Sequence, residues 1–213
     1  GDHRDLHSFP TRRSSDLLIG VSEEQGSLLL KNCIIKDNIF ENPFLILAPW
    51  NLEIEKVLIK GNKIGSNEQS NTLIFVYNIN TIILKDIEFI ANGIYKESTL
   101  MRVINTKMVL LENCVFDSNR FFSWSPNDQL STQKFLIELA SVKISLHNVT
   151  SINDISLISV DNSNIDISQL KFKVNPKINT LTFMTTYNCF VNYENISFEN
   201  ISPEDQQEKL KYW

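Results

Sequence analysis

The sequence contains few of the residues that interrupt regular structure, namely glycine and proline, and few of the cysteines that crosslink a chain or bind a metal. It contains six glycines, six prolines and three cysteines among 213 residues. Three cysteines are too few for a disulfide scaffold, and no Cys-x-x-Cys pair suggests a structural zinc site. Polar or charged residues interrupt every apolar run well before the roughly 18–20 residues that a membrane-spanning helix needs. We therefore expect no metal, no other cofactor and no membrane span in this chain.

Positive charge is also scarce. Twenty Lys and Arg are outnumbered by 25 Asp and Glu, which gives a formal net charge of −5. Such a mildly acidic chain lacks the basic surface with which proteins bind nucleic acids, so we expect no nucleic-acid partner. Hydrophobic residues make up 42% of the sequence, which is enough for a continuous core in one domain.

What the sequence does contain is a repeat. A pattern of apolar-x-apolar, two polar residues and apolar-x-apolar occurs seven times, and only Ser151 breaks it. Repeats that begin 21 to 35 residues apart indicate a coil in which each turn packs on its neighbours. The seven copies occupy residues 28–35, 52–59, 82–89, 109–116, 144–151, 165–172 and 191–198.

A second apolar segment precedes each copy of the pattern. These segments begin at Leu18, Leu45, Leu73, Leu100, Leu136, Leu157 and Leu181. Each repeat therefore predicts three short strands, in which residues i and i+2 share a face. The β-branched and aromatic residues at the inward positions favour strands over helices. We predict an all-β parallel β-helix of about seven three-strand turns over residues 18–201, truncated and without complete caps.

The turns of the predicted coil are rich in Asn and Asp. After the third strand, one of these residues occupies a common position, and Asn200 lies one residue early. Asn and Asp tolerate left-handed backbone and bond to it locally, which suits a tight bend. Stacked at the strand spacing, their side chains can also bond from turn to turn. We predict this structural role for Asn38, Asn62, Asn92, Asn119, Asp154 and Asn175.

These repeats resemble the right-handed parallel β-helix proteins of the pectin-lyase-like class over residues 18–201. The apolar-x-x-Asn pattern also resembles the FxxN repeats of polymorphic outer-membrane proteins, which are surface adhesins on β-helix stalks. The resemblance implies a right-handed coil and an extracellular or cell-surface location. The residues that carry the second resemblance are Ile35, Ile59, Phe89, Phe116 and Phe172, each three positions before its Asn.

The two ends of the chain differ from the repeats. Gly1 to Leu17 resembles, residue for residue, the forward translation of a common short-read sequencing adapter, and it lacks the apolar stretch of a signal peptide. We interpret residues 1–17 as an artefact, and we expect any signal peptide to lie upstream. The first turn should then be open and should self-associate. Residues 202–213 are expected to form a polar tail or linker, or a short helix.

The best candidate for a functional surface is the longest insertion, which spans residues 120–134. Loops that project from a rigid scaffold often carry binding groups, and this one contains Phe121, Phe122 and Trp124. The alternative is that these side chains cover the flank of the coil. A second candidate is the outward column of the first strands, predicted to hold Gly20, Leu47, Phe75, Arg102, Glu138, Ser159 and Phe183. Phe75 and Phe183 could form a binding patch there, and we expect Arg102 and Glu138 to form an ion pair between turns.

Two cysteines and three glycosylation sequons give further predictions. We expect Cys33 and Cys114 to be core residues, because other repeats carry Val, Ile or Leu at the same position. Glycosylation sequons begin at Asn148, Asn195 and Asn200, and they matter if the protein is secreted by a eukaryote.

Two functional hypotheses follow. The first is a non-enzymatic extracellular or cell-surface scaffold or adhesion segment of a larger protein, with carbohydrate or protein as its partner. The alternative is a fragment of a polysaccharide lyase or glycoside hydrolase whose catalytic turns lie elsewhere. Such enzymes cluster several acids and a base on one outer face. The sequence offers no such cluster, so we assign no catalytic residue.

Overall fold

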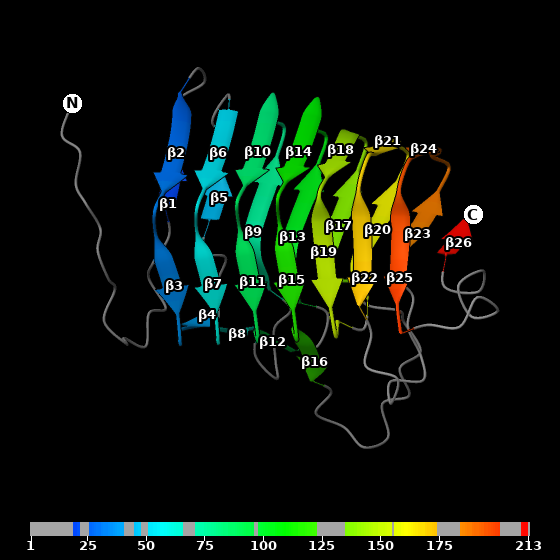
Figure 1. Ribbon diagram of the computed structural model, residues 1–213. Coiled ribbons are helices and arrows are strands. Elements are labelled where there is room, and N and C mark those ends of the chain that lie inside the picture. Colours follow the sequence, from blue (N-terminus) through cyan, green and yellow to red (C-terminus); the bar gives the residue numbers. More distant parts are fainter. Residues whose placement is uncertain are drawn as a thin grey trace.

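The computed structural model describes residues 19–21, 26–40, 45–47, 51–65, 71–95, 98–122, 135–154, 156–173, 184–200 and 210–212. Those ranges form strands and no helix. The strands belong to four sheets, all of them parallel, and each strand pairs with its equivalents in the turns before and after it. The chain is therefore a parallel β-helix, as the repeat predicted, and Figure 1 shows its turns stacked from β2 at one end to β26 at the other.

Each turn contributes one strand to each of the first three sheets. The first sheet contains β1 (Ile19–Val21), β5 (Leu45–Leu47), β9 (Thr72–Tyr77), β13 (Thr99–Ile104), β17 (Ile137–Ala140), β20 (Ile158–Asp161), β23 (Met184–Tyr187) and β26 (Leu210–Tyr212). The second contains β2 (Ser27–Lys31), β6 (Asn51–Glu55), β10 (Thr81–Lys85), β14 (Met108–Glu112), β18 (Lys143–His147), β21 (Asn164–Ile167) and β24 (Phe190–Tyr193). The third contains β3 (Ile34–Lys36), β7 (Leu58–Lys60), β11 (Glu88–Ile90), β15 (Val115–Asp117), β19 (Val149–Ile152), β22 (Leu170–Lys173) and β25 (Ile196–Glu199).

A fourth, shorter sheet is present in the first four turns. It contains β4 (Ile39–Phe40), β8 (Lys63–Ile64), β12 (Gly93–Tyr95) and β16 (Arg120–Phe122). The sequence predicted three strands in each turn and missed these segments, because two or three residues are too few to show a period of two. At the other end, Leu210–Tyr212 pair with β23 as β26 and begin an eighth turn. They form a strand where the sequence suggested a tail, a linker or a short helix.

The register places the apolar repeat inside the coil. The first apolar residues of successive copies are direct partners in the second sheet, as Ile82 is of both Leu52 and Val109. Ile87 and Phe116 lie in adjacent turns and are fully buried, and the ring of Phe116 stacks on Phe89 with centroids 4.8 Å apart. The core is thus a column of like residues, filled from turn to turn.

The cysteines follow the same alignment. Cys33 and Cys114 are buried in the core. Burial raises the pKa of the Cys114 thiol to about 12, and it raises the pKa of Cys33 as well. Both therefore carry protonated thiols and pack as small apolar residues.

Each turn bends at single residues with left-handed backbone. Sixteen non-glycine residues among those described have positive φ, between 47° and 65°, and they fall into three columns, one at each corner of the coil. Most are Asn, which tolerates this conformation better than other residues that carry a Cβ. The first column is Asn78, Asn105, Ser141, Asn162 and Asn188; the second is Asn32, Lys56, Asp86, Asn113, Asn148 and Asn195; the third is Asp37, Ala91, Ser118, Asn153 and Asn200, with Gly61 at the same position in the second turn.

Candidate functional site

The Asn residues after the third strands form a buried ladder along the coil. The side-chain Nδ2 of Asn62 donates to Oδ1 of Asn92 at 3.0 Å, and the Nδ2 of Asn92 donates to Oδ1 of Asn119 at 2.8 Å. Each Oδ1 also accepts from the backbone N–H of the preceding ladder residue, and the second amide hydrogen reaches a strand carbonyl one turn back. The left-handed residue is the one before each ladder Asn, not the ladder residue itself. Asn38 also belongs to the ladder, and Asn175 lies outside the described residues.

In the fifth turn, the last described member of the ladder carries a carboxyl group instead of a carboxamide. Asp154 Oδ1 accepts from the backbone N–H and from the Nδ2 of Asn119, at 2.8 and 3.1 Å. Its Oδ2 accepts from the hydroxyl of Ser151 at 2.9 Å. Ser151 is the one residue that breaks the apolar repeat, so the two exceptions in the sequence contact each other. Desolvation by burial raises the pKa of Asp154 to about 7, although the hydrogen bonds from Asn119 and Ser151 favour its charged form.

The outward column of the first sheet differs from the predicted one in two turns. Its described members are Phe75, Arg102, Glu138, Ser159 and Thr185, and the strand register aligns Ile46 and Gly20 with Phe75. Leu47 was therefore one residue out of register, and the position expected for Phe183 belongs to Thr185. Phe183 itself lies outside the described residues. Phe75 is half-buried beside Arg102, so the structure does not pair it with a second aromatic ring in this column.

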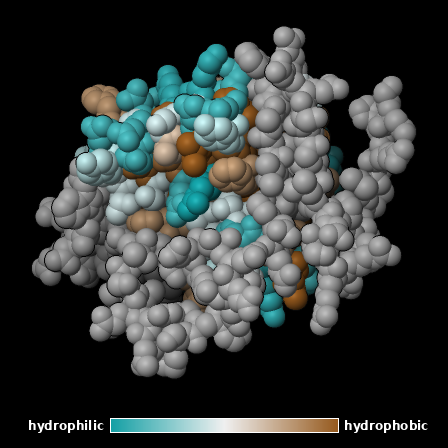
Figure 2. All heavy atoms as spheres, turned by 180° about the vertical axis from the view of Figure 1, so that it is seen from behind, coloured by the Kyte–Doolittle hydropathy of each residue, from teal (hydrophilic) through white to brown (hydrophobic). Residues whose placement is uncertain are grey.

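Arg102 and Glu138 form an ion pair between the fourth and fifth turns. The guanidinium Nη2 and Nε lie 2.5 and 2.7 Å from Oε2 of Glu138, and both side chains are about one third exposed. Similar pairs join Lys31 to Glu55 and Lys171 to Glu199 on the other sheets. These ion pairs connect neighbouring turns on the outer faces. Figure 2 shows hydrophilic and hydrophobic residues interspersed over the described part of the face seen from behind.

The fourth sheet presents a stacked aromatic pair, of which Phe122 is exposed and Tyr95 is half-buried. The rings of Tyr95 and Phe122 stack with centroids 5.3 Å apart, and Phe122 is 45% exposed. Gly93 makes room for them, because a Cβ at that residue would lie 2.9 Å from Phe122 Cε2. Phe121 instead packs against the core. The aromatic residues of the predicted insertion therefore have different environments. Phe121 covers the coil, Phe122 faces outward, and Trp124 lies outside the described residues.

The three sequon residues share one environment. Asn148, Asn195 and Asn200 are exposed and have left-handed backbone at the corners. Asn148 donates from Nδ2 to Asn113 Oδ1 at 2.8 Å, so a glycan there would displace one bond between turns. Glycosylation at all three remains a prediction.

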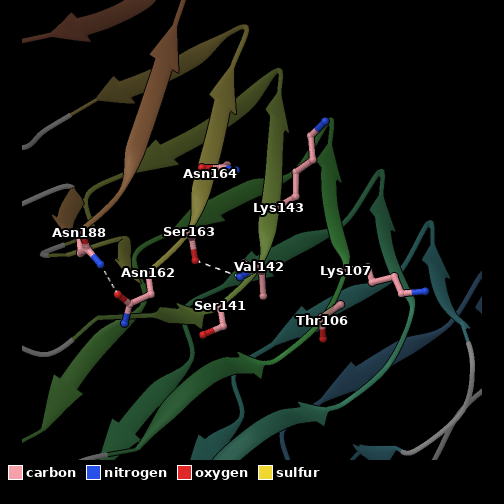
Figure 3. A pocket seen from close by; sticks show the side chains of 9 residues that line it. All are labelled: Thr106, Lys107, Ser141, Val142, Lys143, Asn162, Ser163, Asn164 and Asn188. Carbon is pink, nitrogen blue, oxygen red and sulfur yellow. Dashed lines mark hydrogen bonds between the residues drawn. The ribbon is translucent and has the colours of Figure 1, made fainter.

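A polar hollow lies at the first corner, and the sequence did not reveal it. The corner has three residues in the third and fourth turns, 78–80 and 105–107, but only two in the next turns, 141–142, 162–163 and 188–189. Where the corner shortens, the surface is indented by a hollow of about 450 Å³ (Figure 3). Comparing the number of residues between successive strands could have found it. Its lining is Thr106, Lys107, Ser141, Val142, Lys143, Asn162, Ser163, Asn164 and Asn188.

The described ranges contain neither a metal-binding cluster nor a membrane-spanning helix. No group of three or more His, Cys, Asp or Glu could hold a metal ion among these residues. The imidazole of His147 is exposed, and its Nδ1 lies 2.6 Å from the Ser168 hydroxyl, in the next turn. No helix that could cross a membrane occurs in the described part of the chain.

Comparisons with known proteins give no assignment. No family model matches this sequence, and neither the curated proteins nor the solved structures yielded a significant match.

Proposed function

We propose that this chain is an extracellular or cell-surface β-helix of the right-handed, pectin-lyase-like kind, and that it works as a non-enzymatic adhesive scaffold. The observation that carries the proposal is the stacked pair of Tyr95 and Phe122 on the fourth sheet. A stacked pair on two neighbouring strands, with the Phe122 ring exposed, offers a flat apolar surface with fixed geometry. Sugar rings and protein side chains both bind such surfaces, and little conformational entropy is lost on binding.

The rest of the coil supports the same function. The ladder from Asn38 to Asp154 is buried and bonded in every turn that it crosses, so it holds the third and fourth sheets in register. Ion pairs such as that of Arg102 with Glu138 tie the turns together on the outside. A scaffold needs this uniformity, because a surface ligand can then be held at a fixed distance from the far end of the coil.

The test is retention on surfaces. The chain is incubated with insoluble polysaccharides and with fixed cells, and the bound fraction is measured after washing. We expect Phe122→Ser to lower the retained fraction severalfold. Tyr77→Ser serves as the matched control, since Tyr77 is similarly exposed (49%) on the first sheet. Equal retention of both variants and the wild type would remove the aromatic pair from the proposal.

A second measurement addresses catalysis. The chain is incubated with pectin, alginate and related polymers, with and without calcium, and new reducing ends are measured. We expect none above the rate of a heat-denatured sample. Clear turnover would replace the scaffold proposal with that of a polysaccharide-cleaving enzyme.

A further inference from the structure

The outer side of the fourth sheet and the adjoining ends of the third carry several exposed cations. In Figure 1, β4, β8, β12 and β16 follow the ends of the third-sheet strands around the third corner. Ile39, Lys63, Gly93 and Arg120 are successive register partners on the outside of the fourth sheet. We call this surface the basic face, and its residues are Lys36, Ile39, Lys60, Lys63, Arg120 and Phe122, all of them exposed.

Two lysines of the basic face are direct neighbours. Lys36 and Lys60 are register partners in the third sheet, and like charges at directly paired positions of a sheet repel each other. Other contacts between turns join opposite charges, as Lys31 does with Glu55. The four cations of the basic face form no ion pair with another described residue. The coil therefore keeps a repulsion here that it relieves elsewhere, and an external anion would compensate it.

The charge balance at this corner is positive. The described carboxylates beside the basic face are Asp37, at the bend itself, and Asp117, which accepts a hydrogen bond from the Ser118 hydroxyl. Two carboxylates thus stand against four cations, although the whole chain has a formal net charge of −5. The face is a local concentration of positive charge on an acidic protein, so an anionic partner would meet this side of the coil first.

Apolar side chains are exposed between the cations. Ile39 is 42% exposed in the first turn and Phe122 is 45% exposed in the fourth, where its ring stacks on Tyr95. This combination is typical of surfaces that lie on membranes. Lys and Arg side chains meet the lipid phosphates, while aromatic and aliphatic side chains enter the boundary between the head groups and the acyl chains.

The shape of the basic face favours a broad partner over a small ligand. Gly61, with a φ of 65°, lies between Lys60 and Lys63, so the two lysines project from either side of a convex corner. Small molecules bind in concave sites, whereas a bilayer offers a plane of phosphates. At about 4.8 Å per turn, the cations from the first turn to the fourth extend over roughly 14 Å, so they can reach more than one phosphate group.

We propose that the basic face binds the surface of an anionic phospholipid membrane, with Lys36, Lys60 and Lys63 at the phosphates and Phe122 among the head groups. The inference rests on the proposed function, because it shares Phe122 and names a partner for the same sheet. The face extends from turn to turn, so this contact would hold the long axis of the coil along the membrane.

The experiment is co-sedimentation of the full 213-residue chain with vesicles. One set of vesicles contains phosphatidylcholine alone, and the other contains phosphatidylcholine and phosphatidylglycerol in equal parts. We expect binding to the anionic vesicles to be at least about tenfold tighter, and to weaken as the salt concentration rises. Glycerol phosphate and polyglutamate, each added at the same concentration of charge as the lipid, should displace little of the bound chain, because neither offers an apolar boundary for Phe122.

Lys60→Glu tests the face by two measurements. We expect it to weaken binding to the anionic vesicles by more than about tenfold, since each unit of charge near the surface contributes about fivefold. It should also raise the melting temperature of the free protein slightly, because a glutamate beside Lys36 replaces repulsion with attraction. Lys143→Glu is the matched control: Lys143 is exposed on the second sheet, forms no ion pair with a described residue, and changes the net charge equally. Its vesicle binding should stay close to that of the wild type.

Several results would overturn the inference. These are equal binding to neutral and anionic vesicles, equal losses in Lys60→Glu and Lys143→Glu, and full displacement by either competitor. Displacement by polyglutamate would assign the face to an acidic protein, and displacement by glycerol phosphate would assign it to a free phosphate. Absent vesicle binding, together with retention on polysaccharides or cells that Phe122→Ser lowers, would leave the proposed function standing. Vesicle binding with retention that Phe122→Ser does not change would remove the aromatic pair from that function and leave the basic face.

Discussion

The first four turns of the coil and the three turns after them are built by the same strands but different corners. Turns one to four carry a fourth sheet and a ladder of carboxamides, and the first corner of turns three and four has three residues. Turns five to seven have no described strand in the fourth sheet, their first corner has two residues, and the fifth turn places Asp154 in the ladder.

All these changes separate the fourth turn, which ends with β16, from the fifth, which begins with β17, yet the register of the strands continues across this boundary. Val109 pairs with Ile144 in the second sheet as regularly as Leu52 pairs with Ile82. The comparison shows that the inward strand positions determine the coil, whereas the corners can change length without disturbing it. Surface features such as the hollow therefore arise at corners.

The largest expected effect concerns the buried inward positions of the repeat, which are equivalent in both halves. Ile87→Asp in the third turn and Ile165→Asp in the sixth would each bury an unpaired carboxylate, at a cost of several kcal/mol. We expect both variants to lose the cooperative unfolding transition in urea, followed by circular dichroism. Leu29→Asp is the control, because Leu29 is 56% exposed on β2. A native-like transition in Ile87→Asp would contradict the inward assignment.

The next largest effect separates the buried ladder from the exposed corner Asn residues. Asn92→Ala removes a side chain that bonds to Asn62, Asn119 and the Ile59 carbonyl, and it leaves buried groups unpaired. We expect it to lower the free energy of unfolding by about 3 kcal/mol. Asn105→Gly removes an exposed side chain while allowing the same positive φ, and it should cost less than about 1 kcal/mol. If urea titrations gave the same loss of unfolding free energy for both variants, burial of the ladder would contribute nothing to stability.

Asp154→Asn would make the ladder of the fifth turn like that of the first four. Because the folded-state pKa of Asp154 is raised to about 7, the folded protein binds more protons than the unfolded chain between about pH 4 and pH 7. The stability that Asp154 contributes is therefore complete at acidic pH and is lost as the pH rises through 7. We expect Asp154→Asn to stabilise the protein by roughly 1–3 kcal/mol at pH 8 and by little at pH 4.

The measurement is urea unfolding of the wild type and of Asp154→Asn between pH 4 and pH 8. Ser151→Ala in the wild-type background is the control: without the Ser151 hydroxyl, the carboxylate loses a donor, and the pH dependence should become steeper. A wild-type stability that rises from pH 4 to pH 8 with no difference from Asp154→Asn would show that the carboxyl group is not desolvated in the folded state.

The smallest expected effect on stability concerns the ion pair on the outer surface between the fourth and fifth turns. Arg102 and Glu138 join the fourth turn to the fifth, but both are exposed enough for water to screen them. A double-mutant cycle with Arg102→Leu and Glu138→Leu should give a coupling of less than about 1 kcal/mol, lower still in 1 M salt. A larger coupling that salt does not reduce would indicate that this pair helps to hold the two halves together.

The sequence predicts the strands well because their physical requirement is local. Ile82 and Leu84 must both face the core, and alternation states this without knowledge of any other turn. The common position of Asn62, Asn92 and Asn119 likewise indicated a ladder. What the sequence does not show is which corner residue has left-handed backbone, since Asn at either of two adjacent positions suits a bend.

The candidate sites are harder to predict, because they depend on how neighbouring turns align and not on a local pattern. The hollow depends on a one-residue difference between corners 105–107 and 141–142, which only becomes visible once the strands on both sides are fixed. The Tyr95–Phe122 pair depends on a fourth sheet that is too short to recognise in the sequence. The contact between Ser151 and Asp154 joins two residues that looked like separate irregularities.

The stacking of the turns has a mechanical consequence. Backbone hydrogen bonds in a parallel sheet run across the strands, so in this coil they run along its long axis, from each turn to the next. Tension applied between the two ends would act on the bonds between all turns, and because each turn contacts mainly its neighbours, the turns can separate one at a time. We expect such a coil to lengthen in small, repeated steps, each releasing the contour of one turn, so that a tether made from it would yield gradually while the remaining turns stay folded.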